Sequence, residues 1–198
     1  MTKTVRLQEE WKKVPAIIAA YDRVIDPLYS TPTSEFQRRC DLVKKALADA
    51  GFDIGFIFSD EQYAGDVPYL GGNTNVSIEQ VAGVIGPTGV HIIAGLEGGY
   101  VAEQLAPRAG AVAHKVEMLQ LADEKYPVAA ERMQDVLSAA AGKPMSQISK
   151  IALLTPRQVL PASLVEHLEE LVGKKNVVDA QALYYRVKYL RSPMWKSG

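Results

Sequence analysis

The hydrophobic positions of this chain follow two different periods, and the alternation of the two predicts alternating helices and strands. Spacings of three and four residues predict amphipathic helices at 7–29, 33–50, 97–106, 127–141 and 160–172. Short apolar or alternating runs predict strands at 53–58, 81–85, 90–94, 111–116, 151–154 and 176–179. Within the fourth helix, Ala130, Met133 and Leu137 are expected to point inward.

Turn residues set how these elements connect. Gly86-Pro87-Thr88-Gly89 separates two of the strands by a tight turn and predicts an antiparallel hairpin. Residues 59–75 are rich in Gly, Asp, Asn and Pro and predict an extended, exposed connection in which Gly71-Gly72 allows a sharp change of direction. Helices that alternate with strands around one hairpin indicate an α/β fold, with a mixed sheet covered on both faces.

Composition narrows the class of protein. With 198 residues, of which 47% are hydrophobic and 23% charged, the chain has the composition of a globular protein of one domain. Its 22 basic and 23 acidic residues nearly cancel, so neither nucleic acid nor an anionic membrane is expected as a partner. The polar start carries no signal peptide, and glycines interrupt the most apolar region, 81–96. A single cysteine, Cys40, fits a reducing compartment, and we expect a cytoplasmic protein.

Few residues have the chemistry of a catalytic or metal site. His91, His114 and His167 are far apart in the sequence, whereas a metal site needs several ligands converging at about 2.0–2.3 Å. Hydrogen-bonded structural roles are therefore the expectation for the histidines, and no metal is assigned. No nucleophile motif occurs, and Cys40 lies among apolar residues of a predicted helix, where it fits the core. We assign no catalytic residue to this chain.

Three phrases, taken in order, resemble one family of proteins. They are residues 38–47 before Gly51-Phe52-Asp53, then Tyr69-Leu70-Gly71-Gly72 after the first strand, and finally residues 179–193, which end in Ser192-Pro193. Together they resemble the N-terminal domain of the pita-bread metallopeptidases: the creatinase, prolidase and Xaa-Pro aminopeptidase family. The resemblance covers residues 36–193. It implies a mixed six-stranded sheet flanked by helices on both faces, with ribonuclease-H-like topology.

The resemblance also implies how the chain is organised. Residues 1–30 are then a helical extension, 31–188 the creatinase-type accessory domain, and 189–198 the start of a linker to an absent C-terminal catalytic domain. Family members hold two divalent ions (Mn, Co or Zn) with two Asp, one His and two Glu in that second domain. None of those motifs lies here, so no cofactor is expected in this chain. Accessory domains of this family build a homodimer and cover the partner's active site, where a peptide or another small molecule is the substrate.

One segment departs from the family's pattern. Where creatinase-like relatives bring an aromatic residue and an arginine towards the neighbouring subunit's substrate, this chain places Ser77 and Glu79, with Asn75 beside them. A carboxylate would favour a cationic group over a substrate carboxylate. The alternative for these three residues is a solvated loop.

Other functions remain open at this point. A catalytically inactive relative could serve as a stand-alone protein-binding module, and the parent could instead be a creatinase-like amidinohydrolase or a lyase. The helix predicted at 7–29 could bury its apolar face on its own domain or on a second subunit.

Overall fold

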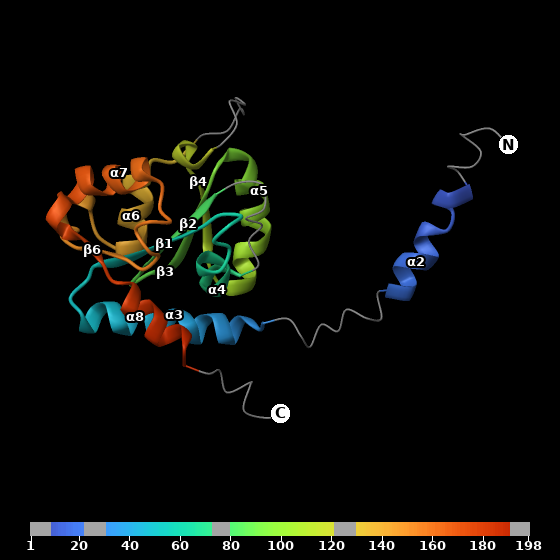
Figure 1. Ribbon diagram of the computed structural model, residues 1–198, viewed down its shortest axis with the longest axis horizontal. Coiled ribbons are helices and arrows are strands. Elements are labelled where there is room, and N and C mark those ends of the chain that lie inside the picture. The colour runs from blue at the N-terminus through green and yellow to red at the C-terminus, as the bar shows by residue number, and fades with distance from the viewer. Residues whose placement is uncertain (1–8, 22–30, 73–79, 121–129, 191–198) are drawn as a thin grey trace. The chain divides into compact units, whose positions relative to one another are not determined.

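The computed structural model describes residues 9–21, 31–72, 80–120 and 130–190 (Figure 1). The chain divides into two compact units, Met1–Thr31 and Pro32–Gly198. The first unit is helical at residues 9–11 and in α2 (Val14–Tyr21), and a turn at 12–13 separates the two. The turn falls just before Pro15, which suits the first turn of a helix because it has no N–H to leave unpaired. The predicted helix at 7–29 is thus present but interrupted, and residues 22–30 lie outside the described part.

A six-stranded sheet in the order β4-β3-β2-β1-β5-β6 forms the centre of the second unit. Its central strands β1, β2 and β3 pair antiparallel, and the outer strands pair parallel. The predicted hairpin is therefore confirmed. The strands are β1 (Ile54–Ser59), β2 (Val81–Gly86), β3 (Gly89–Ala94), β4 (Val112–Lys115), β5 (Ile151–Leu153) and β6 (Val177–Asp179).

Helices cover both faces of the sheet, as the pattern predicts (Figure 1). Alternate side chains of β1 illustrate the two cores, since Phe56 packs in one hydrophobic cluster and Ile57 in the other. The first cluster lies under α6 (Met133–Ala141) and α7 (Ala162–Val172). The second lies under α3 (Thr33–Asp49), α4 (Asp66–Gly71), α5 (Leu96–Leu105) and α8 (Gln181–Lys188). No helix in the described ranges is long and apolar enough to cross a membrane.

The expected extended connection at 59–75 is wrong in its middle, where the chain forms α4. Val67 and Leu70 are fully buried in the second cluster, and this packing outweighs the local preference for a loop. Gly71 allows the close approach, because a Cβ atom there would lie 2.3 Å from Cδ1 of Ile92 in β3. The next residue, Gly72, has a φ of 83°, which favours glycine and turns the chain away from the helix.

The helix predicted at 127–141 begins only at Met133. Met133 and Leu137 are buried as predicted, but Ala130 is exposed, contrary to the prediction. Before the helix, the backbone N–H of Glu131 donates to the carbonyl oxygen of Lys115 at 2.8 Å. This pairing with β4 keeps the backbone extended as far as Arg132 and delays the start of the helix.

Candidate functional site

Polar side chains gather where the parallel strands β1 and β5 end. Ser59 is the last residue of β1, and its Oγ accepts a hydrogen bond from the backbone N–H of Val67 at 3.0 Å. Thr155 follows β5, and its Oγ1 accepts from the backbone N–H of Phe58 at 2.9 Å. In open α/β sheets, ligands bind outside the carboxyl ends of the strands, so this edge is the first place to look for a site.

Asp66 is the centre of this cluster, and its side chain is completely buried. Its Oδ1 forms an ion pair with Nζ of Lys188 at 2.6 Å, and its Oδ2 accepts a hydrogen bond from the hydroxyl of Thr155 at 2.6 Å. The backbone carbonyl of Asp66 accepts a further bond from the hydroxyl of Tyr184 at 2.8 Å. A buried carboxylate needs such partners because its desolvation is costly. The contacts join α4, α8 and the end of β5 at one point.

Three tyrosines surround this point and are held in their neutral form. Burial raises the pKa of Tyr184 well above its ordinary value, and the charge of Asp66 raises it further. Burial, a hydrogen bond to Tyr185 and the charge of Asp66 raise the pKa of Tyr63, whose hydroxyl lies 3.2 Å from that of Tyr185. The pKa of Tyr69 is also raised by burial. Neutral phenols donate hydrogen bonds, and none of the three is poised as a base or a nucleophile.

A second group of charges fixes the far end of α4. Nε of Arg39 lies 2.9 Å from a carboxylate oxygen of Glu35, and its other nitrogen donates to the carbonyl oxygen of Tyr69 at 3.0 Å. The guanidinium also lies over the Tyr69 ring, 4.4 Å from its centroid. Helix α3 thereby holds α4 just before Gly72, where the candidate segment begins.

The predicted site residues Asn75, Ser77 and Glu79 lie outside the described residues. The structure places only the ends of their segment, at Gly72 and Gln80. Val81, the next residue, pairs with Ser59 of β1 and with Ala94 of β3. The Gln80 end of the segment therefore lies at the edge of the sheet where Asp66 and its partners gather, whereas Gly72, beyond the other end of α4, lies near Leu105 and Ala109.

A chain of hydrogen bonds that sequence reasoning missed runs along β3 and β4. Oγ1 of Thr88 lies 2.9 Å from Nε2 of His91, and Nδ1 of His91 lies 2.8 Å from Nε2 of His114. Nδ1 of His114 in turn lies 2.9 Å from a carboxylate oxygen of Glu131. The two imidazole rings are stacked, with an interplanar angle of 17°. Both histidines are hydrogen-bonded, as expected, but they are neighbours in space.

A hydroxyl, an imidazole and a carboxylate linked in this order resemble a catalytic triad, in which the hydroxyl is the nucleophile. Whether Thr88 could act as a nucleophile depends on what surrounds its hydroxyl. Its hydroxyl lies 2.9 Å from the carbonyl oxygens of both Ala139 and Ala140, at the C-terminal end of α6. Carbonyl oxygens and the negative end of a helix would repel a developing oxyanion. Burial, and then the charge of His114, lower the pKa of His91 to about 4. This series of hydrogen bonds, from Thr88 through the two histidines to Glu131, is therefore suited to holding protons in place rather than to acyl transfer.

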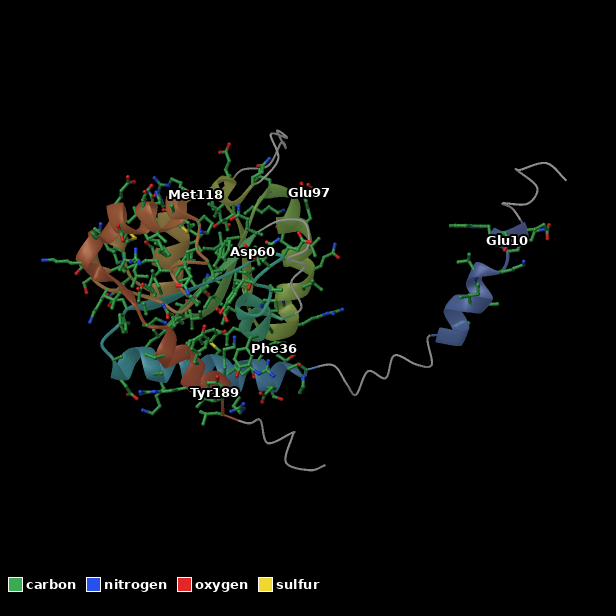
Figure 2. All side chains as sticks on the ribbon, viewed as in Figure 1. Glu10, Phe36, Asp60, Glu97, Met118 and Tyr189 are labelled. Carbon is green, nitrogen blue, oxygen red and sulfur yellow. The ribbon has the colours of Figure 1, made fainter. Side chains whose placement is uncertain are left out.

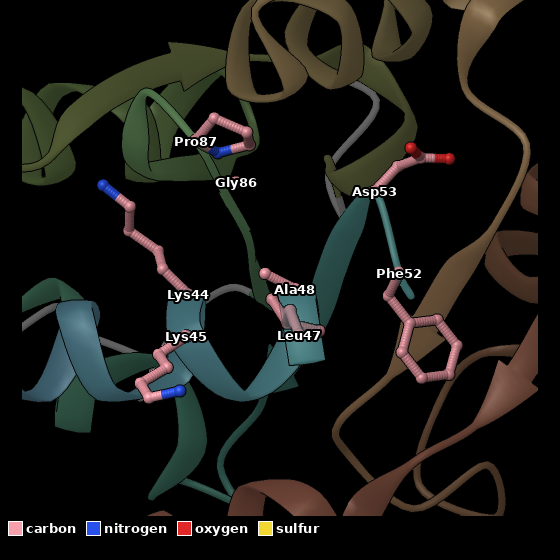
Figure 3. Close-up of a pocket in the computed structure, with 8 residues that line it drawn as sticks. All are labelled: Lys44, Lys45, Leu47, Ala48, Phe52, Asp53, Gly86 and Pro87. Carbon is pink, nitrogen blue, oxygen red and sulfur yellow. The ribbon is translucent and has the colours of Figure 1, made fainter. Parts of the chain in front are cut away.

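Two further observations bear on ligands. Among the described residues, no three His, Cys, Asp or Glu side chains are placed to share a metal ion. A hollow of about 380 Å³ lies beside α3 and the hairpin, lined by Lys44, Lys45, Leu47, Ala48, Phe52, Asp53, Gly86 and Pro87 (Figure 3).

The polar groups of this hollow do not converge on a ligand. Lys44 extends along Pro87, whereas the side chain of Lys45 turns away from it (Figure 3) and pairs with Asp49. Asp53 is already bonded to Lys143 and to the backbone of Ser149 and Lys150. A binding pocket has a few convergent polar groups, and this hollow has none.

Comparisons with known proteins come from structure alone, since no family model and no curated protein matches the sequence. Among solved structures, the dipeptidase PepE of Mycobacterium ulcerans matches 83% of this chain with a TM-score of 0.54 and 15% identity. An Xaa-Pro dipeptidase of Bacillus anthracis matches 80% with a TM-score of 0.52 and 14% identity. A prolidase of Pyrococcus furiosus matches 78% with a TM-score of 0.51 and 9% identity.

The matched part is 39%, 37% and 39% of those chains, so this chain spans about two-fifths of the length of its structural neighbours. Identities this low show the fold alone. The fold implied by the sequence resemblance is confirmed: a mixed six-stranded sheet with helices on both faces, as in the N-terminal domains of prolidase-like proteins.

Proposed function

We propose that this chain is the non-catalytic N-terminal domain of an Xaa-Pro dipeptidase- or aminopeptidase-like metallohydrolase. In this role it contributes to a homodimer and covers the active site of the partner subunit. The observation that carries the proposal is the fold, which matches about two-fifths of the chains of a dipeptidase, an Xaa-Pro dipeptidase and a prolidase. The order of the sequence phrases at 38–47, 69–72 and 179–193 supports the same assignment.

The chemistry of the described residues supports a non-catalytic role. The charge of Asp66 is balanced by its ion pair with Lys188, and burial keeps the tyrosines around it neutral. His91 is neutral at physiological pH. Under the proposal, the divalent ions (Mn, Co or Zn) and the reacting groups belong to the catalytic domain that follows the linker at 189–198. The Asp66–Lys188 pair then fixes α8, the helix that precedes this linker.

The substrate-facing part of the domain is, in this proposal, the segment with Asn75, Ser77 and Glu79. The segment ends at Val81, which pairs with Ser59 and Ala94 at the carboxyl edge of β1. A carboxylate at Glu79 would select a substrate amine or a basic side chain, so the expected substrates are small peptides with a cationic group. A desolvated contact of this kind contributes on the order of 1–3 kcal/mol.

The first test compares the 198-residue chain with the protein encoded by the complete reading frame. Both are supplied with Mn²⁺ and assayed for hydrolysis of Xaa-Pro dipeptides. The proposal predicts metal-dependent turnover by the complete protein and none by the 198-residue chain. Turnover by the chain alone would contradict the non-catalytic assignment. A complete protein without turnover would favour the protein-binding module or another reaction.

The second test replaces Glu79 by Gln in the complete protein. The specificity constant for a dipeptide with a basic first residue should fall by about 5- to 150-fold, because 1–3 kcal/mol is lost from the transition state. The constant for a neutral dipeptide should not change. The matched control is Glu166→Gln, on the exposed surface of α7. Equal losses of the specificity constant for both substrates, or no loss for either, would contradict a role of Glu79 in substrate selection and favour the alternative of a solvated loop.

A further inference from the structure

The contact between His91 and His114 has room for a single hydrogen. Their facing nitrogens are 2.8 Å apart, so one must donate and the other must accept. When both imidazoles are neutral, one arrangement of hydrogens satisfies the whole chain. The hydroxyl of Thr88 donates to His91, His91 donates to His114, and His114 donates to the carboxylate of Glu131. Each gap then holds one hydrogen.

A first added proton fits this chain without breaking it. If Nε2 of His91 is protonated, the Thr88 hydroxyl accepts from it and turns its own hydrogen to a carbonyl oxygen of Ala139 or Ala140, both 2.9 Å away. A second proton does not fit. It would place two hydrogens in the 2.8 Å gap between His91 and His114 and two like charges in stacked rings. The doubly protonated pair must open.

This contact lies at the margin of the sheet. His91 belongs to β3 and His114 to β4, which is the edge strand of the described sheet and pairs there with β3. On its outer side, in the residues that the structure describes, Glu131 pairs with the backbone of Lys115. Separating the two imidazoles therefore acts directly on the pairing of a short edge strand.

Few other charged groups face the pair. Within the described ranges, Glu131 is the ionisable group in contact with it, and β2 presents Val84 on this face. At the start of α6, Arg132, the residue before the helix, pairs with Asp135 in solvent. On the opposite face of β4, Lys115 pairs with Glu103 and lies over the ring of Tyr100 in α5, and Glu117, after β4, is exposed. In these ranges, Glu131 is the carboxylate that faces the pair, and no further carboxylate there compensates a second positive charge.

We propose that the His91–His114 contact is an acid-sensitive latch, closed at neutral pH, whose double protonation releases β4 from the edge of the sheet. The latch requires only residues of this chain. It acts before global unfolding, because β1 and β5 remain buried in the centre of the sheet, while β4 has one neighbouring strand and, in the described residues, one backbone hydrogen bond from Glu131 on its outer side.

Hydrogen exchange measured from pH 7 to pH 3.5, corrected for the intrinsic rate at each pH, tests the latch. Protection of residues 112–115 should fall at least about tenfold with acidification, while residues 54–59 keep theirs. His91→Gln retains a side chain that can bridge Thr88 and His114 but cannot take up a proton, and it should keep β4 protected. The control His167→Gln removes a histidine of α7 whose nearest carboxylate, on Glu170, is 3.9 Å away, and it should behave as the parent chain does.

Two results would overturn the proposal. One is the same loss of protection at 112–115 in His91→Gln as in the parent chain. The other is loss of protection in β4 and β1 together at one pH, which would indicate global unfolding. Imidazole ¹⁵N spectra of the unmodified chain provide a test that needs no variant. They should show at most one added proton on the pair while β4 is protected, and two imidazolium rings with β4 still protected would contradict the latch.

Discussion

Replacing Lys188 by Met leaves the carboxylate of Asp66 buried without its counter-ion. Met keeps an unbranched side chain of similar length beside the rings of Tyr69 and Tyr184. Removing one partner of a buried ion pair typically costs about 3–5 kcal/mol, because the other charge stays desolvated. Asp66 is completely buried, but it keeps the hydrogen bond from Thr155, so the lower end of this range is expected.

The free energy of unfolding, obtained from urea titrations followed by far-ultraviolet circular dichroism, should therefore fall by about 3 kcal/mol. For a domain of this size, such a loss lowers the Tm by about 6–12 °C. The matched control is Lys45→Met, which breaks the Lys45–Asp49 pair in which both side chains are more than 60% exposed. Exposed pairs of this spacing contribute about 0.3–0.5 kcal/mol.

A double variant separates the charge from the packing. Asp66→Asn combined with Lys188→Met removes both charges, and Asn can still accept a hydrogen bond from Thr155. The double variant should be more stable than Lys188→Met alone. If Lys188→Met costs no more than Lys45→Met, the Asp66 cluster does not join α4 to α8, and the account of this edge of the sheet is wrong.

Further predictions concern packing, pH and metal. Gly86→Ala should lower the free energy of unfolding by about 1–3 kcal/mol, because the added Cβ would lie 2.2 Å from the carbonyl oxygen of Ala140. The control is Gly65→Ala, whose added Cβ meets open space and should cost less than about 1 kcal/mol. The pKa of His91 is depressed from 6.5 to about 4 in the folded state, so its contribution to stability is present above pH 6.5 and is lost as the pH falls towards 4. In the parent chain, the free energy of unfolding should therefore fall by about 3 kcal/mol on acidification through this range, and in His91→Gln this fall should be absent. The same pH dependence in both proteins would refute the prediction. Chelator should leave the Tm of the chain unchanged, and a stoichiometric Mn²⁺ site tighter than about 1 μM by calorimetry would contradict the assignment of the metals to another domain.

The spacing of hydrophobic residues predicts most of the helices and strands of this fold, because an element buried on one face shows that face as a periodic pattern in its own sequence. The hairpin around Gly86-Pro87-Thr88-Gly89 and the helices at 33–49 and 162–172 follow from such local signals. Helix α4 does not, because its stability comes from burying Val67 and Leu70 against distant strands. The start of α6 does not follow from the local pattern either, since the pairing of Glu131 with β4 outweighs the helical periodicity of residues 127–132.

The polar clusters could not be predicted in the same way. Asp66 and Lys188 are 122 positions apart, and no local pattern brings them together. The contact of His91 with His114 depends on the parallel pairing of β3 with β4 and on which face each residue occupies. Placing the two histidines on adjacent strands with inward-facing positions is the signal that could have revealed it. Tyr189, labelled in Figure 2, directly follows α8. Its side chain is 83% exposed, as expected for the start of a linker.

A structure of the complete protein with a bound Xaa-Pro peptide analogue tests most directly whether, as we propose, this domain covers the active site of a partner subunit. We predict a dimer in which the segment of one subunit that contains Asn75, Ser77 and Glu79 lies beside the peptide bound to the other subunit. A carboxylate oxygen of Glu79 should be within hydrogen-bonding distance of the peptide's cationic group. A monomer, or a dimer in which this segment faces solvent, would contradict the claim.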